Sequence, residues 1–279
     1  MKFDASEILE LKKKFKEDGF LLLKNFYSFD NDIFPIQQDI MKIISAVCMK
    51  NDILVKIDTP ADAMNIGYPL LIAKNRSLGG VVYDAVKQIP GFLRLVAKKE
   101  NQEIVQMLRD DCVPGIAAGG YGIRIDNPSE EKFRAQWHQE FPAQLRSLDG
   151  IVFWSPLVPV LREIGPVQMA VGSHKGGPLP VYRNDKGVNA SNAYALHVHD
   201  IEKHLKKYDI IAPLTSPTDL ILMDFQLLHQ SGTNESDQPR WSMQFRYFNF
   251  LEPVGQRINW AGSFAAGLDF AEILPELVV

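Results

Sequence analysis

Two side chains that bind metal ions stand two positions apart in the segment 136–140. This segment is predicted to be a strand, in which residues i and i+2 point to the same face, so His138 and Glu140 would project into one cavity. An imidazole and a carboxylate placed in this way supply two of the three ligands of a facial metal triad. A second histidine from a distant strand must supply the third. Three ligands on one face leave open positions for a co-substrate and O2, which suits non-haem Fe(II).

The best candidate for the third ligand is His229. It follows the apolar run 219–224, which is predicted to be a buried strand, and a position just after a strand end is common for a ligand. A histidine and a glutamate two residues apart are weak evidence by themselves, because most such pairs arise by chance. The prediction gains weight from the residues that come after His229.

Arg240 stands eleven residues after His229 and opens a predicted strand over 240–247 in which apolar and polar residues alternate. Arginine can hold a carboxylate through two parallel hydrogen bonds. Ser231 could add a hydroxyl donor to the same carboxylate. The competing interpretation is that Arg240 and Arg246 are ordinary strand residues that face solvent.

The predicted secondary structure that positions these residues changes from helices to short strands near residue 114. The part before it, about 1–113, is predicted to be mainly helical, and the tail of about 251–279 to carry a short helix near 270–274. Residues of about 114–250 show short β-like runs separated by glycine and proline, which indicates a closed or two-sheet antiparallel structure within a single domain of 1–279. The predicted strands are 20–23, 121–125, 134–140, 150–157, 167–171, 210–211, 219–224 and 241–250, and the predicted helices include 36–49, 81–86, 92–97 and 104–108.

The composition excludes several classes of protein. The 279 residues carry a formal net charge of −4 with a sequence pI of about 5.9, so there is no basic excess that would indicate a nucleic-acid partner. Two cysteines make no disulfide framework and fit a reducing compartment. No apolar run approaches the ~20 residues needed to cross a bilayer. We therefore expect a cytoplasmic protein that acts on a small molecule, in an oligomeric state that the sequence leaves open.

Several motifs, taken together, resemble the phytanoyl-CoA dioxygenase family of Fe(II)- and 2-oxoglutarate-dependent oxygenases. The resemblance extends from about residue 5 to 250, and five motifs in the correct order make it specific. One departure is that the family usually has an aspartate where this chain has Glu140. The motifs are a helix ending in an Asp-Gly-Phe turn and an apolar strand (17–24), Trp-His-Gln-Glu (137–140), Phe-Trp-Ser-Pro-Leu (153–157), a Gly-Pro to Gly-Ser-His-Lys stretch (164–177), and His229 with Ser231, Asn234, Ser236 and Arg240.

The resemblance implies a mainly β fold with flanking helices: a double-stranded β-helix, or cupin-like jelly-roll barrel, with helices packed outside. It implies that His138, Glu140 and His229 bind Fe(II), that Arg240 and Ser231 bind the distal carboxylate of 2-oxoglutarate, and that Trp154 lines the same pocket. The implied reaction is hydroxylation of a C–H bond with release of succinate and CO2. Desaturation and ring formation can use the same cofactors.

Two other functions use the same residues. A cupin-like isomerase or epimerase could employ the triad with Zn or Mn and without oxygen chemistry, but it would not need Arg240 or Ser231. A non-catalytic binding protein could keep the barrel alone, although intact ligands at three positions argue against it. Iron-dependent release of CO2 from 2-oxoglutarate would separate these functions. The long connection of about 173–208 is expected to close over substrate as a lid, and its His197 and His199 are weaker metal candidates.

Overall fold

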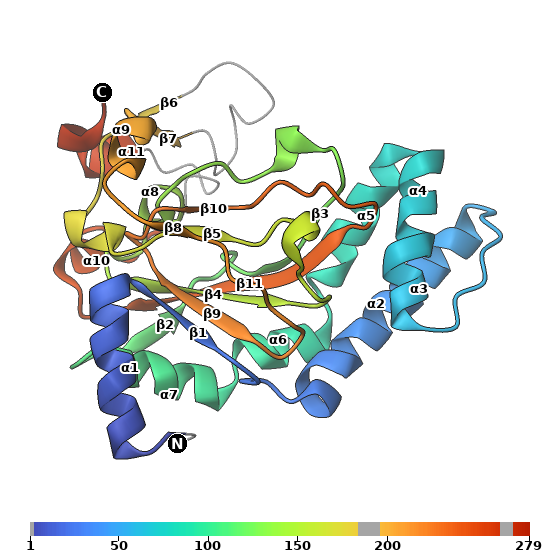
Figure 1. Cartoon of the computed structure of the whole chain (residues 1–279), viewed down its shortest axis with the longest axis horizontal. Coiled ribbons are helices and arrows are strands. Elements are labelled where there is room, and N and C mark those ends of the chain that lie inside the picture. The colour runs from blue at the N-terminus through green and yellow to red at the C-terminus, as the bar shows by residue number, and fades with distance from the viewer. Residues whose placement is uncertain (1–2, 184–195, 263–269) are drawn as a thin grey trace.

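In the computed structural model, which describes residues 3–183, 196–262 and 270–279, the strands pair into three antiparallel sheets (Figure 1). The large sheet has the order β1-β9-β4-β11-β2, and β3 also pairs with β11; the other sheets are β10-β5-β8 and β6-β7. Part of the predicted 173–208 lid, residues 184–195, lies outside the described residues. The strands are β1 (Phe20–Leu23), β2 (Pro114–Ile116), β3 (Gly122–Asp126), β4 (Gly150–Pro156), β5 (Gln168–Ala170), β6 (Val181–Arg183), β7 (Leu196–Val198), β8 (Ile210–Ile211), β9 (Leu220–Asp224), β10 (His229–Gln230) and β11 (Arg240–Asn249).

Helices occupy more of the described chain than strands do, so the fold is mixed α/β, and the expectation of a mainly β chain underestimated its helical part. Within the described ranges, no helix combines the length and the apolar character that a membrane span requires. The helices are α1 (Ala5–Asp18), α2 (Phe34–Lys50), α3 (Pro60–Asp62), α4 (Tyr68–Lys74), α5 (Arg76–Val86), α6 (Pro90–Val96), α7 (Lys99–Leu108), α8 (Glu140–Gln144), α9 (Ile201–Leu205), α10 (Pro253–Arg257) and α11 (Phe270–Ile273).

Local hydrogen bonds define both ends of the first helix. Asp4 caps α1 by accepting hydrogen bonds from the backbone N–H groups of Ser6 and Glu7, and the Glu7 carboxylate accepts the N–H of Asp4 at 2.8 Å. Gly19 ends the helix in the left-handed conformation, with φ at 81°. The chain then enters β1, which pairs with β9 and so joins the N-terminal part to the large sheet.

The two faces of the large sheet pack against different layers. Along β4 and β9, residues such as Phe153 and Leu222 enter the core that the helices cover, whereas their neighbours Trp154 and Met223 belong to a second core with residues of the small sheet. This is the alternation that a strand imposes. In β11, Trp241, Met243, Phe245 and Tyr247 belong to the core that the helices cover. The polar residues that alternate with them, from Arg240 to Arg246, therefore lie on the side of the small sheet.

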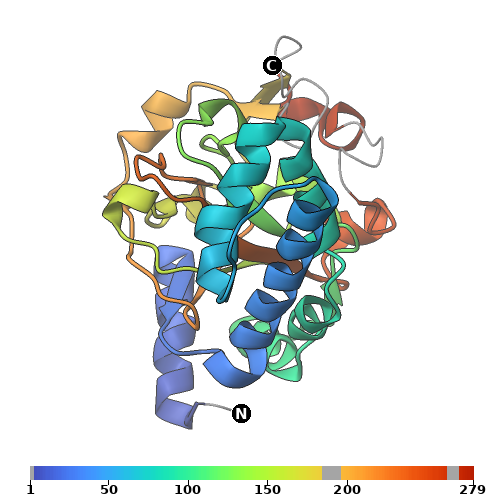
Figure 2. The same ribbon diagram turned by 90° about the vertical axis from the view of Figure 1, so that its right-hand side faces the viewer.

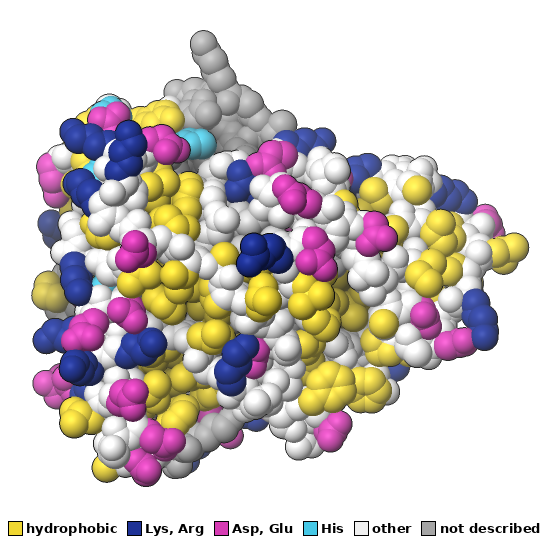
Figure 3. Space-filling model, viewed as in Figure 1, with side chains coloured by type: hydrophobic (Ala, Val, Ile, Leu, Met, Phe, Trp, Pro, Cys, Tyr) yellow, Lys and Arg dark blue, Asp and Glu magenta, His cyan; other side chains and the backbone are white. Residues whose placement is uncertain are grey.

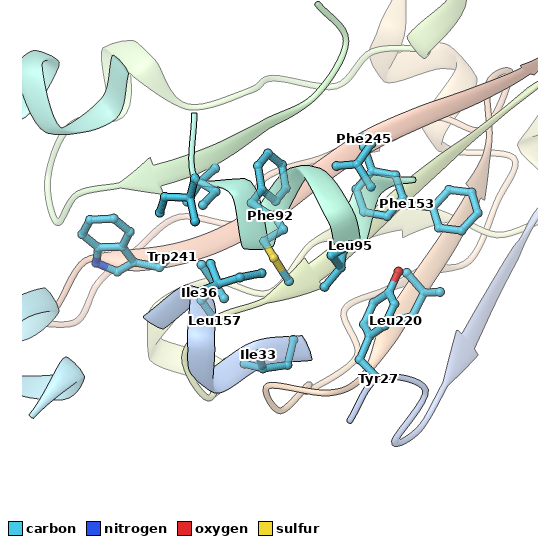
Figure 4. Packing of buried hydrophobic residues seen from close by; sticks show 14 of the residues in the cluster. Tyr27, Ile33, Ile36, Phe92, Leu95, Phe153, Leu157, Leu220, Trp241 and Phe245 are labelled. Carbon is cyan, nitrogen blue, oxygen red and sulfur yellow. The ribbon is translucent and has the colours of Figure 1, made fainter. Parts of the chain in front are cut away.

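Packing against the helices fixes the position of the large sheet. Phe92 and Leu95 of α6 lie against the strands, where the rings of Phe153 and Phe245 stack with their centroids 4.9 Å apart (Figure 4). Figure 2 shows α2 and α4 covering the end of the sheet, with α5 behind them. The large sheet, whose other side carries polar side chains toward the small sheet, is thus held in place by a largely apolar face.

Candidate metal centre

The structure brings His138, Glu140 and His229 together. One possible ligand atom from each residue lies within 4.8 Å of the others. The Oε2 atom of Glu140 is 3.8 Å from Nε2 of His138 and 3.5 Å from Nε2 of His229. The three side chains are largely buried, with 13%, 3% and 7% of the side-chain surface exposed for His138, Glu140 and His229.

Backbone pairing, rather than a long strand, sets this convergence. The predicted strand 134–140 is reduced to one antiparallel bridge, in which His138 and His229 exchange backbone hydrogen bonds of 3.0 and 3.1 Å. Glu140 begins helix α8, and its N–H donates to the carbonyl of Phe225 at 2.8 Å. The same-face rule for strands therefore does not account for the position of Glu140: the turn into α8 places its carboxylate beside the histidines.

Both imidazoles are held in the tautomer that can bind a metal through Nε2. His138 Nδ1 lies 2.6 Å from the carbonyl of Gln136, and His229 Nδ1 lies 2.9 Å from that of Leu227. A carbonyl oxygen can only accept a hydrogen bond, so Nδ1 carries the proton and the ring lone pair is on Nε2. Burial, together with the neighbouring His229, lowers the pKa of His138 and favours its neutral form.

The carboxylate of Glu140 is kept ionised in this buried site. Burial alone would raise the pKa of Glu140, but the Arg246 guanidinium and the two histidines outweigh burial and hold the pKa well below its ordinary value. Oε1 accepts a hydrogen bond from Arg246 Nε at 2.9 Å, whereas the buried Oε2 has no hydrogen-bond partner within the described part of the chain. An unpaired anionic oxygen facing two imidazole lone pairs fits a divalent cation.

The two histidines form one wall of a pocket between the sheets. Trp154 of β4 and Ser231, both candidates from the sequence, also line the pocket, and so does Gln244 of β11, for which no role was predicted. The residues that line the pocket are Ala135, His138, Val152, Trp154, Val167, Met223, His229, Gln230, Ser231 and Gln244.

Arg240 is 1% exposed, so the interpretation of Arg240 as a solvated strand residue is wrong. Its Nη2 pairs with Asp126 at 2.8 Å across the β3–β11 register, and its Nη1 lies 3.4 Å from the carbonyl of Gly232, next to Ser231. Arg124 pairs with the same aspartate. Two guanidinium groups around one carboxylate leave a net charge of +1 beside the Ser231 end of the pocket.

The ion-paired state of Asp126 predicts a pH dependence of stability. Burial opposes its ionisation, but Arg124 and Arg240 outweigh burial and hold the pKa at about 2, below the ordinary 3.8. A depressed carboxyl pKa contributes stability that is fully present above the unfolded pKa and is lost as pH falls toward the folded pKa, so the contribution is about 2 kcal/mol at neutral pH. We expect the stability difference between the parent and Asp126→Asn in urea to be about 1 kcal/mol smaller at pH ~3 than at pH ~6. An equal difference at both pH values would contradict this assignment.

The residue between the two ligands faces the opposite way. The Gln139 side chain donates to the carbonyls of Gly177 and Gln226 at 2.9 and 2.7 Å and accepts the N–H of Leu179 at 2.8 Å. Gln139 therefore ties the beginning of the 173–208 connection to the segment that carries His138 and Glu140. In the sequence, only the position of Gln139 between two candidate ligands could have indicated this role.

The other histidines lie apart from the triad. His197 stacks on Tyr182 with the ring centroids 5.6 Å apart, and His199 lies near Asp200. Among the described residues, the only group of three or more histidine, cysteine or acidic side chains placed to hold a metal is the triad itself. The weaker metal candidates of the sequence thus gain no support.

The site has two histidines and one carboxylate on one side of a pocket between antiparallel sheets. This ligand set is typical of proteins with a mononuclear non-haem metal. The family model of phytanoyl-CoA dioxygenase (PhyH) matches residues 15–242. This range covers the triad and Arg240, and the chain belongs to this family. The resemblance drawn from the sequence motifs is confirmed.

Solved structures with a similar fold are described as binding iron or as dependent on alpha-ketoglutarate. They include the epimerase SnoN in complex with Fe3+, alpha-ketoglutarate and nogalamycin RO, with a TM-score of 0.57, 14% identity, and coverage of 88% of this chain and 85% of that chain. EctD from S. alaskensis with bound Fe has a TM-score of 0.53, 17% identity, and coverage of 88% and 77%. The carbocyclase SnoK has a TM-score of 0.54, 14% identity, and coverage of 89% and 85%. At such identities the likeness shows a common fold. No functionally curated protein sequence matches the chain.

Proposed function

We propose that this protein is an Fe(II)- and 2-oxoglutarate-dependent dioxygenase that hydroxylates a C–H bond of a small-molecule metabolite. The observation that carries the proposal is that the Nε2 atoms of two imidazoles converge, at a pocket wall, on the buried Oε2 of Glu140, which has no hydrogen-bond partner among the described residues. His138, Glu140 and His229 would hold the iron. When bound, iron and 2-oxoglutarate would allow O2 to oxidise the substrate, and 2-oxoglutarate would be converted to succinate and CO2.

Arg240 and Ser231 would bind the distal carboxylate of 2-oxoglutarate. The net positive charge of the cluster formed by Arg124, Asp126 and Arg240 can accept a second carboxylate. Two buried donors on the pocket-facing side of β11, Arg240 Nε and Ser242 Oγ, have no hydrogen-bond partner among the residues that the structure describes. Trp154 would enclose the same ligand and keep water from it.

We assign the two main sheets to the two layers of a double-stranded β-helix. Their shared apolar core and the polar face of β11 between them agree with this fold. The substrate would be a small molecule rather than a nucleic acid, since basic and acidic side chains are interspersed over the face shown in Figure 3. The beginning of the 173–208 connection, which Gln139 ties to the segment that carries His138 and Glu140, would form part of the substrate side of the pocket.

The cofactor chemistry can be tested by visible absorption without oxygen. We expect the protein with Fe(II) and 2-oxoglutarate to show a weak band near ~500–530 nm, a property of the iron–2-oxo acid chelate. Addition of O2 should then release CO2 and succinate from 2-oxoglutarate. Absence of both the band and the CO2, combined with tight binding of Zn or Mn, would instead favour an isomerase or epimerase that uses no oxygen.

Epimerisation that begins with oxidation is a second candidate, because SnoN is an epimerase that was crystallised with Fe3+ and alpha-ketoglutarate. It would share the release of CO2 with hydroxylation, but it would also consume an external two-electron reductant, because an epimer has the same oxidation level as its substrate. Reaction under 18O2 distinguishes the two, because succinate takes up one oxygen atom from O2 in both reactions, whereas only hydroxylation leaves the other atom in the product formed from the substrate.

A further inference from the structure

Arg246 contacts the one triad residue in which this chain departs from the family pattern. Its side chain leaves the polar face of β11, six residues after Arg240, and is 8% exposed. Nε donates to Glu140 Oε1 at 2.9 Å, Nη1 to the carbonyl of Gly120 at 3.2 Å, and Nη2 to Gln244 Oε1 at 2.9 Å. All three nitrogens thus have partners, which fixes the guanidinium plane.

The two oxygens of Glu140 consequently differ. Oε1 is engaged by Arg246, whereas Oε2 faces Nε2 of both histidines and has no hydrogen-bond partner among the described residues. A glutamate side chain is one methylene longer than aspartate and has more rotamers to restrict. Arg246 restricts them and turns a single oxygen toward the histidines.

The same contact sets the direction of the Gln244 amide. A guanidinium offers only donors, so the amide oxygen of Gln244 must face Arg246. Its NH2 group is then directed away from Arg246, and Gln244 is one of the residues that line the pocket. Arg246 therefore connects a metal ligand and a pocket residue through one rigid group.

We propose that Arg246 is a positioning residue that keeps Glu140 as a one-oxygen metal ligand and so preserves three open coordination positions, two for the 2-oxo acid and one for O2. This inference rests on the proposed metal centre but not on the identity of the reaction. Without Arg246, both oxygens of Glu140 can bind the metal. The second oxygen then takes one of the three positions that the 2-oxo acid and O2 need together, and it restricts how the 2-oxo acid can bind.

The test uses the full chain with Mn(II) as the probe, because Mn(II) accepts the same nitrogen and oxygen ligands and its bound waters can be counted by pulsed EPR in 2H2O. Three protein ligands on a six-coordinate ion leave about three waters in the parent. We expect Arg246→Met to leave about two waters and to weaken 2-oxoglutarate binding to the Mn(II) protein by about tenfold or more. Arg246→Lys, which keeps a donor near Oε1, should restore part of this affinity.

Arg240→Met is the matched control, since it removes another buried arginine from the same face of β11 whose carboxylate partner is Asp126. It should keep about three waters on Mn(II), because the triad is untouched. Failure of the parent to bind Mn(II) would count against the proposed metal centre. About two waters in the parent would overturn the inference even if Arg246→Met did not fold, and so would an unchanged water count with unchanged 2-oxoglutarate affinity in a folded Arg246→Met.

Discussion

Replacement of His229 by alanine should remove iron binding and turnover while the fold persists. The substitution deletes one of three ligands, and changes at outer-shell partners alone cost about 10- to 100-fold in affinity or activity, so we expect a loss of at least about 100-fold in both. The fold should persist because the hydrogen bonds between positions 138 and 229 join backbone atoms, which the substitution leaves in place. Fe(II) titration monitored with 2-oxoglutarate by absorption, together with CO2 release, measures the two effects.

His204→Ala is the matched control for this prediction. His204 lies in α9, outside the candidate metal group, and its loss should leave Fe(II) affinity and CO2 release unchanged. If His229→Ala bound iron as the parent does, or if both variants lost activity equally, the assignment of His229 as a ligand would be wrong.

Arg240→Met should raise the KM for 2-oxoglutarate by about 10- to 100-fold, since a hydrogen bond to a charged group contributes about 1.5–3 kcal/mol. Metal binding should persist because Arg240 contacts Asp126 and Gly232, not the triad. Steady-state CO2 release at varied 2-oxoglutarate measures the change in KM. Methionine keeps much of the apolar volume of the arginine stem, so the change reports mainly on the lost charge and donors.

The interpretation of Arg240→Met needs a comparison with Arg124→Met, because both arginines pair with Asp126. A direct contact between Arg240 and the co-substrate predicts a much larger KM change for Arg240→Met. Equal changes would mean that only the charge of the cluster matters. No change in either variant would place the distal carboxylate at another group of the pocket.

The local elements could be read from the sequence because their causes are local. The Asp4–Glu7 capping box, the stop at Gly19 and the alternation along β11 depend on residues within one or two turns or on the two-residue period of a strand. The order of the motifs likewise indicated the family. The helical proportion was underestimated because several helices, such as α5 with its two glycines, begin earlier than their apolar spacing indicates.

The sequence by itself singled out the candidate site residues: two histidines and a carboxylate, which the structure brings together, and an arginine on a strand with a polar face. Only the tertiary structure decided which partners those residues have. Asp126 meets Arg240, and Arg246 meets Glu140, across more than one hundred residues of chain. Strand alternation fixes the face of a side chain, but the register between strands distant in sequence fixes its neighbour, and that register follows from packing of the whole sheet.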